Sequence, residues 1–194
     1  MPTGPQQATI YSDDHGKTWE RGAIVVNSSE EIPNPSESMA VQLADGRVLL
    51  SIRNESTKNR RVFSIQPGWR DELVEAGFDE GLFEPICAAS IVRFGASPAD
   101  PDPRILFSNP ESAKLTSANP TRANRPRQML TIKLSMDDAK TWTPQRIQDP
   151  GVAGYSDLAV DGGRTSTFYM KKALSRGVRR TTRIPSWQSS RSVG

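Results

Sequence analysis

Cysteine and histidine are nearly absent from this chain of 194 residues, which contains one of each, Cys87 and His15. A single cysteine excludes an internal disulfide framework. One histidine and one cysteine argue against a zinc site and against a histidine-dependent nucleophile, and His15 stands at a turn position typical of a solvated residue. We therefore expect neither a metal nor another cofactor.

Long apolar runs are also missing, because no stretch approaches the roughly 20 apolar residues that cross a bilayer. The first five residues have no apolar core of the kind found in a signal peptide. We expect no transmembrane segment, and the sequence leaves the compartment open. Charge is nearly balanced, with 25 Lys and Arg against 22 Asp and Glu, and much of the basic excess follows Gly162. The charge is thus a weak sign of a polyanionic partner, and we expect no nucleic-acid partner.

Short strand-like runs separated by turn residues are present instead, at 23–26, 39–43, 48–52, 86–94 and 104–108. Asp45 and Gly46 stand between two of these runs, and Asp-Gly between apolar runs is a strong hairpin signal. We therefore predict an all-β fold of short antiparallel strands in one domain with a sizeable core.

One stretch of the chain occurs twice. Residues 12–19 read Ser-x-Asp-x-Gly-x-Thr-Trp, and residues 135–142 repeat the pattern with Ala139 in place of glycine. The aspartate can accept hydrogen bonds from the loop backbone, glycine permits a positive φ, and tryptophan anchors the turn. Ala139 would be strained if its φ is positive.

This repeated turn resembles the Asp-box of sialidases and related β-propellers. The resemblance implies blades that are antiparallel four-stranded sheets. At about 40–50 residues per blade, residues 1–162 hold about four blades of an incomplete six-bladed propeller. A propeller with open strand edges is expected to self-associate or to pair with another chain.

A second resemblance to sialidases lies at residues 34–54, where a glutamate precedes a Leu-x-Asp-Gly hairpin that ends in Arg-Asn. It places the family's catalytic glutamate on Glu37 and the second arginine of its triad on Arg53. Residues 83–93 are similar to a strand that lines the sialidase pocket, with Ala88 where a polar residue is usual. That change would alter contacts to the acyl or glycerol group of the sugar.

The third arginine and the nucleophile follow from the same resemblance. Sialidases run from Phe-Ser-Asn-Pro into Arg-x-Asn-Leu-Thr and then an Asp-box, which places the third arginine on Arg127, with Met129 where asparagine is usual. Arg122 and Arg125 are near enough to be alternatives. Residues 151–159 are close to the family's Gly-x-x-Gly-Tyr-Ser-x-Leu-Ala, which assigns the nucleophile to Tyr155.

These residue types suit the chemistry that the resemblance implies, the release of terminal sialic acid by an exo-α-sialidase. Arginine holds the sugar's carboxylate with bidentate geometry. A tyrosine is neutral until a base takes its proton, so its attack avoids repulsion by that carboxylate. The implied partners are sialylated oligosaccharides, glycoproteins and glycolipids.

The chain also departs from the family. The first arginine and the acid/base aspartate of sialidases precede the first Asp-box by more than a blade, and only eleven residues stand before Ser12. We therefore expect turnover to be impaired in this chain. The alternatives are an inactive propeller fragment, a module that binds sialylated glycans, and an Asp-box protein without a glycan function, in which the four residues would not converge.

Residues 163–194 match no propeller motif. A polyanion-binding tail is one interpretation of their basic character. A frameshift is the other, since the codons of 168–172 read two bases later allow Leu-Tyr-Glu-Lys-Gly, which sialidases carry on the last blade. We predict a non-native, disordered tail.

Overall fold

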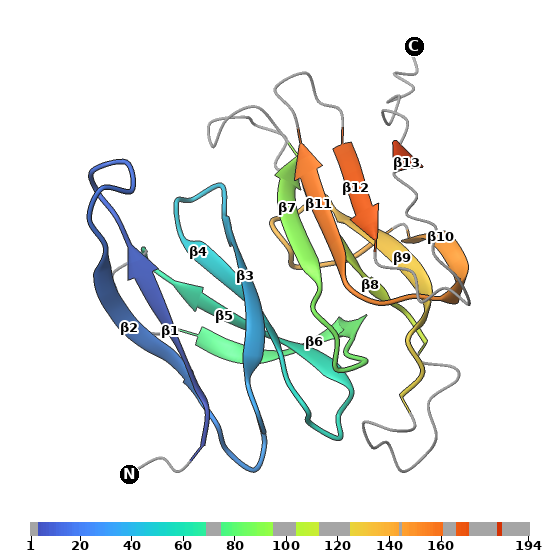
Figure 1. Cartoon of the computed structure of the whole chain (residues 1–194), viewed down its shortest axis with the longest axis horizontal. Coiled ribbons are helices and arrows are strands. Elements are labelled where there is room, and N and C mark those ends of the chain that lie inside the picture. The colour runs from blue at the N-terminus through green and yellow to red at the C-terminus, as the bar shows by residue number, and fades with distance from the viewer. Residues whose placement is uncertain are drawn as a thin grey trace.

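The computed structural model describes residues 4–68, 75–94, 104–112, 125–143, 145–160, 166–170 and 182–183, which form strands and turns without a helix (Figure 1). The predicted all-β fold is confirmed. Within these ranges no helix has the length and hydropathy to cross a membrane.

The strands form four antiparallel sheets in which neighbours along the chain are hydrogen-bonded to each other. The first sheet contains β1 (Gln6–Tyr11) and β2 (Glu20–Asn27). The second contains β3 (Ser36–Gln42), β4 (Val48–Arg53), β5 (Arg60–Gln66) and β6 (Glu75–Phe83). The third contains β7 (Ser90–Phe94), β8 (Arg104–Pro110), β9 (Gln128–Ser135) and β10 (Gln145–Val152). The fourth contains β11 (Ser156–Val160), β12 (Ser166–Met170) and β13 (Thr182–Arg183).

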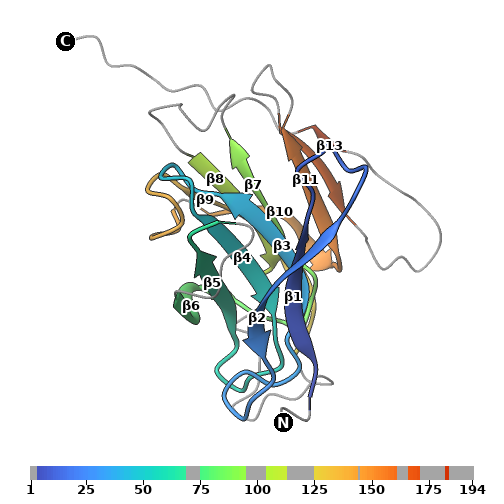
Figure 2. The same cartoon turned by 90° about the vertical axis from the view of Figure 1, so that its left-hand side faces the viewer.

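Consecutive sheets pack face to face, and the first strands of three of them lie side by side. Strand β7 contacts both β3 and β11, as Figures 1 and 2 show from two directions. An apolar cluster fills each space between neighbours: around Val25 and Ile52, around Leu49 and Phe107, and around Leu130 and Leu158. This stacking is that of propeller blades, and it brings the ends of β3, β7 and β11 together.

The turn after β1 is closed by its own side chains. Asp14 accepts hydrogen bonds from the Thr18 amide at 2.9 Å and hydroxyl at 2.7 Å, and Ser12 accepts one from the Gly16 amide at 2.8 Å. The bonds from Thr18 and Ser12 lower the pKa of the Asp14 carboxyl to about 2. Gly16 has a φ of 83°, which glycine adopts without strain.

The turn after β9 repeats this arrangement. Asp137 accepts bonds from the Thr141 amide at 2.9 Å and hydroxyl at 2.6 Å, and Ser135 accepts one from the Ala139 amide at 2.8 Å. Ala139 has a φ of 64°, so the strain predicted for an alanine at this position is present. The two turns thus share one pattern of hydrogen bonds, although Ala139 replaces glycine in the second.

The tryptophans of the two turns differ in their surroundings. Trp19 is 60% exposed, and its indole N–H donates to the carbonyl of Gly16 in its own turn. Trp142 reaches the preceding sheet, where its N–H donates to Asp79 at 2.9 Å and its ring lies 6.2 Å from that of Phe63. Trp142 therefore ties the third sheet to the second.

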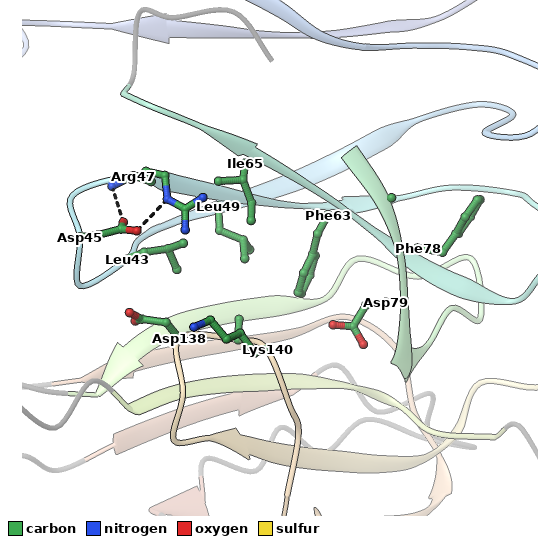
Figure 3. A pocket seen from close by; sticks show the side chains of 12 residues that line it. Leu43, Asp45, Arg47, Leu49, Phe63, Ile65, Phe78, Asp79, Asp138 and Lys140 are labelled. Atoms are coloured by element: carbon green, nitrogen blue, oxygen red, sulfur yellow. Dashed lines mark hydrogen bonds and ion pairs between the residues drawn. The ribbon is translucent and has the colours of Figure 1, made fainter. Parts of the chain in front are cut away.

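A cavity of about 390 Å³ lies where the second turn meets the preceding sheet (Figure 3). Leu43, Asp45 and Arg47 line it from the hairpin between β3 and β4, with Asp138 and Lys140 opposite. None of the four predicted site residues lines this cavity.

Part of the predicted tail is described. Strand β12 pairs with β11, and β13 pairs with β12. The rest of 163–194 lies outside the described residues, so its disorder and the frameshift stay predictions.

Replacing Trp142 by alanine should lower the free energy of unfolding by on the order of 3 kcal/mol, because an aromatic ring is lost from between two sheets. The same change at Trp19, whose ring is mostly in solvent, should cost less than about 1 kcal/mol. Urea unfolding followed by circular dichroism measures both, and equal losses for the two variants would contradict the proposed inter-sheet role of Trp142.

Candidate active site

The four predicted site residues come from three sheets and meet at one end of the fold. Glu37 lies in β3, and Arg53 is the last residue of β4. Arg127 immediately precedes β9, and Tyr155 immediately precedes β11. Hydrogen bonds and a ring contact connect all four.

Glu37 is the residue at which β3 departs from regular pairing. Ser36 pairs with Arg53 and Ser38 with Ile52, so Glu37 is an extra residue on its strand, and its φ is 37°. This is a β-bulge, a feature that redirects a side chain. The carboxylate accepts one hydrogen bond from the Arg53 guanidinium and another from the Tyr155 hydroxyl.

The pKa of the Glu37 carboxyl lies below its usual range. Burial raises this pKa, but the hydrogen bonds from Tyr155 and Arg53 and the charges of Arg53 and Arg127 outweigh burial. Glu37 is therefore a carboxylate at neutral pH, in contact with the proton of Tyr155.

Tyr155 combines an accessible ring with a perturbed hydroxyl. The side chain is 39% exposed, so a ligand can approach it. Its hydrogen bond to Glu37 and, secondarily, burial raise the pKa of the phenol. The hydroxyl is neutral at rest, with its proton directed at a base.

Arg53 is nearly covered, with 8% of its side chain exposed. Burial lowers the pKa of its guanidinium, but the hydrogen bond and charge of Glu37 outweigh burial and raise this pKa above its usual value. Arg53 therefore stays positively charged. A carboxylate of Glu55 lies 3.7 Å away. The buried Nε–H of Arg53 meets no acceptor among the described residues.

Arg127 lies over the ring of Tyr155. Its guanidinium carbon is 5.7 Å from the centroid of the Tyr155 ring, and it donates a hydrogen bond to the carbonyl of Ile86. Arg125 instead donates to the carbonyl of Ser56 at 2.7 Å. Of these two candidates for the third arginine, Arg127 is the one beside Tyr155, and Arg122 lies outside the described residues.

Two substitutions that the sequence singled out, Met129 and Ala88, fall within the described residues. Met129 has a φ of 58°, a conformation that asparagine tolerates better than methionine does. Ala88 lies with Met39 and Ala89 on the wall of a cavity of about 390 Å³ that Glu37 and Tyr155 also line. Ser38, Ser156 and Asp157 line the same cavity, so the space next to the reactive pair is bordered by small apolar side chains and by polar ones.

Sequence reasoning missed two charged residues behind the site. Arg61 and Glu84 have fully buried side chains and form an ion pair at 2.5 Å. Arg61 also donates to the backbone carbonyl of Glu37 at 3.3 Å. Nothing in the sequence signals this pair, because a charged residue at a strand end usually faces solvent.

Other chemistries find little support in the described residues. Burial raises the pKa of the Cys87 thiol to about 11, so this cysteine is protonated at neutral pH and is a poor nucleophile. No group of three or more His, Cys, Asp and Glu side chains within the described ranges could hold a metal ion.

Replacing Glu37 by glutamine should lower the pKa of Tyr155 toward that of free tyrosine, because the carboxylate stabilises the protonated phenol. Tyrosinate absorbance at 295 nm, followed during alkaline titration and corrected with a Tyr155→Phe chain, measures this pKa. An unchanged Tyr155 pKa in the glutamine variant would mean that the two side chains are not hydrogen-bonded in solution.

The comparisons with known proteins agree on one family. The chain is 33% identical over 168 residues to a sialidase of Micromonospora viridifaciens, and 30% identical over 170 residues to a sialidase of Vibrio cholerae. These alignments include 84% and 77% of this chain, but only 23% and 20% of the two relatives. The chain thus spans less than a quarter of either relative's length. No protein-family model matches it.

Solved structures show the same fold. A Hadza microbial sialidase matches with a TM-score of 0.60 at 23% identity, over 82% of this chain and 28% of that one. The NanB sialidase from Streptococcus pneumoniae matches with a TM-score of 0.63 at 17% identity, over 89% of this chain and 25% of that one. The chain belongs to the sialidase family and corresponds to part of a sialidase propeller.

Proposed function

We propose that this chain carries the nucleophile, the base and two carboxylate-binding arginines of an exo-α-sialidase, a glycoside hydrolase that releases terminal sialic acid from glycoconjugates. The observation that supports the proposal most is the Tyr155 hydroxyl donating to the Glu37 carboxylate, with Arg53 bonded to Glu37 and Arg127 over the Tyr155 ring. Substrates would be sialylated oligosaccharides, glycoproteins or glycolipids.

Substrate binding would change the state of the base. Arg53 is bonded to Glu37 in the free chain. The carboxylate of a bound sialic acid would also accept hydrogen bonds from the Arg53 guanidinium. The bond from Arg53 to Glu37 would then weaken, and the pKa of Glu37 would rise because that bond lowers it. The base would therefore become stronger when the substrate is in place, which couples recognition to proton transfer.

The proposed chemical step uses the same four residues. Tyr155 Oη attacks the anomeric carbon and forms a C–O bond, while its proton passes to Glu37. The bond from that carbon to the leaving oxygen breaks, and the leaving group keeps the electron pair. Arg53 and Arg127 offset the charge around the oxocarbenium-like transition state. Water then attacks the same carbon, and the bond from that carbon to Tyr155 Oη breaks. Tyr155 takes back the proton held by Glu37, the proton lost by the water passes through solvent to the departed leaving group, and two inversions retain the configuration.

A general acid for the leaving oxygen is not among these four residues. An alcohol leaving group needs such a proton, and general acid help is worth roughly 10²–10⁴-fold. A phenolate leaving group is stable as an anion, so it departs without a proton from a general acid. The same four residues without that acid would also suffice for a module that binds sialylated glycans, which is the second candidate function.

The purified chain should release fluorophore from a 4-methylumbelliferyl sialoside, whose leaving group needs no proton. Cleavage of 3′-sialyllactose should be slower by at least about a hundredfold, since its leaving group depends on a general acid. Fluorescence measures the first reaction, and chromatography of released sialic acid measures the second.

Tyr155→Phe is the matched control because it removes only the reacting oxygen. Its turnover of the aryl sialoside should fall by at least about a hundredfold. Aryl sialoside turnover that survives this change would contradict the role of Tyr155. Sialyllactose binding without turnover, seen by saturation-transfer NMR and lost in Arg127→Ala, would favour the binding module.

A further inference from the structure

Every N–H group of the buried Arg61 guanidinium, behind the candidate site, donates a hydrogen bond. Its Nε donates to Ser51 Oγ at 3.0 Å, and one terminal nitrogen donates to Glu84 at 2.5 Å and to the Cys87 carbonyl at 3.0 Å. The other terminal nitrogen donates to the carbonyls of Glu37 at 3.3 Å and Ser51 at 3.4 Å. A guanidinium has five N–H groups, and all five are engaged. Its orientation is therefore fixed from several sides.

Glu84 links the same group to the opposite wall of the site. One of its carboxylate oxygens accepts from Arg61, and the other accepts from the Cys87 amide at 3.0 Å. The residue before Cys87 is Ile86, which has a φ of 56° and whose carbonyl accepts from Arg127. The pair thus contacts the backbone beside Glu37 and the backbone that holds Arg127.

The backbone at Glu37 needs such support. A residue other than glycine with a positive φ costs on the order of 1 kcal/mol or more. Glu37 is also the extra residue of a bulge, so regular strand pairing does not hold it. The Arg61 bond falls on the carbonyl of this strained residue, directly behind the carboxylate that contacts Tyr155.

We propose that Arg61, oriented by Glu84 and Ser51, is a positioning residue that fixes the bulge at Glu37 and thereby the reach of the Glu37 carboxylate to Tyr155. This inference rests on the proposed function, because it concerns the residue to which we assign the role of base. Arg61 acts through Glu37 and has no exposed surface with which to meet a substrate.

The test uses two variants of the full chain. Arg61→Lys keeps a positive charge beside Glu84, but a lysine ammonium cannot reach all five acceptors of the guanidinium. We therefore expect this variant to fold and to lose the hydrogen bond to the Glu37 carbonyl. Arg61→Met/Glu84→Gln removes both charges, which avoids an uncompensated buried carboxylate, and it keeps an acceptor for the Cys87 amide. Urea unfolding reports whether each variant folds.

Ionisation of Tyr155, followed at 295 nm, is the main readout. We expect both variants to lose the elevation of the Tyr155 pKa, because Glu37 no longer reaches the hydroxyl. Where the chain cleaves the aryl sialoside, kcat should fall by about tenfold to a hundredfold while KM changes little. Arg60→Lys is the matched control, because Arg60 is the neighbouring residue and pairs with Glu80 at the surface. This variant should leave the Tyr155 pKa and kcat unchanged.

A folded variant at Arg61 that keeps the wild-type Tyr155 pKa would overturn the proposal and leave the pair with a purely structural role. If Arg61→Lys does not fold, the double variant decides in the same way. Ionisation of Tyr155 does not depend on turnover. A wild-type chain without activity would therefore count against the proposed function, and the titration would still decide the role of Arg61.

Discussion

The need of each sheet to cover its apolar faces is the constraint on which this structure depends. A twisted antiparallel sheet of short strands cannot bury such a face alone, so each sheet lies against the next. The three apolar clusters each occupy one such space, and β3, β7 and β11 are drawn together as the sheets stack. The ends of these strands then converge. Side chains that are 118 residues apart in the sequence, Glu37 and Tyr155, meet there as a consequence of packing.

Much of the fold could be predicted from the sequence because its signals are local. Asp45 and Gly46 predicted the hairpin between β3 and β4, where Gly46 has a φ of 88°. The repeated Ser-x-Asp turns owe their shape to hydrogen bonds within eight residues. The predicted run at 86–94 was too long, because Ile86 has a positive φ and β7 begins at Ser90.

The candidate site could be predicted only in part. Glu37, Arg53, Arg127 and Tyr155 were found by resemblance, since each stands in a recognisable motif, while their meeting depends on contacts between sheets. No sequence pattern predicted the ion pair of Arg61 and Glu84. Both side chains are buried only because the sheets pack around them, and this packing cannot be read from the residues near either one. The choice of Arg127 over Arg125 likewise needed the direction of each side chain.

The stacking of the sheets determines where unfolding begins. Each apolar cluster lies between two adjacent sheets, so the energetics resemble a one-dimensional array in which every unit is stabilised by its nearest neighbours. The β1–β2 sheet contributes to one cluster, whereas the second sheet contributes to two. Opening can therefore begin at that outer hairpin while the other three sheets, and the contact of Glu37 in the second sheet with Tyr155 at the start of the fourth, persist. Local opening of this kind would be seen as amide exchange that is faster in β1 and β2 than in β4.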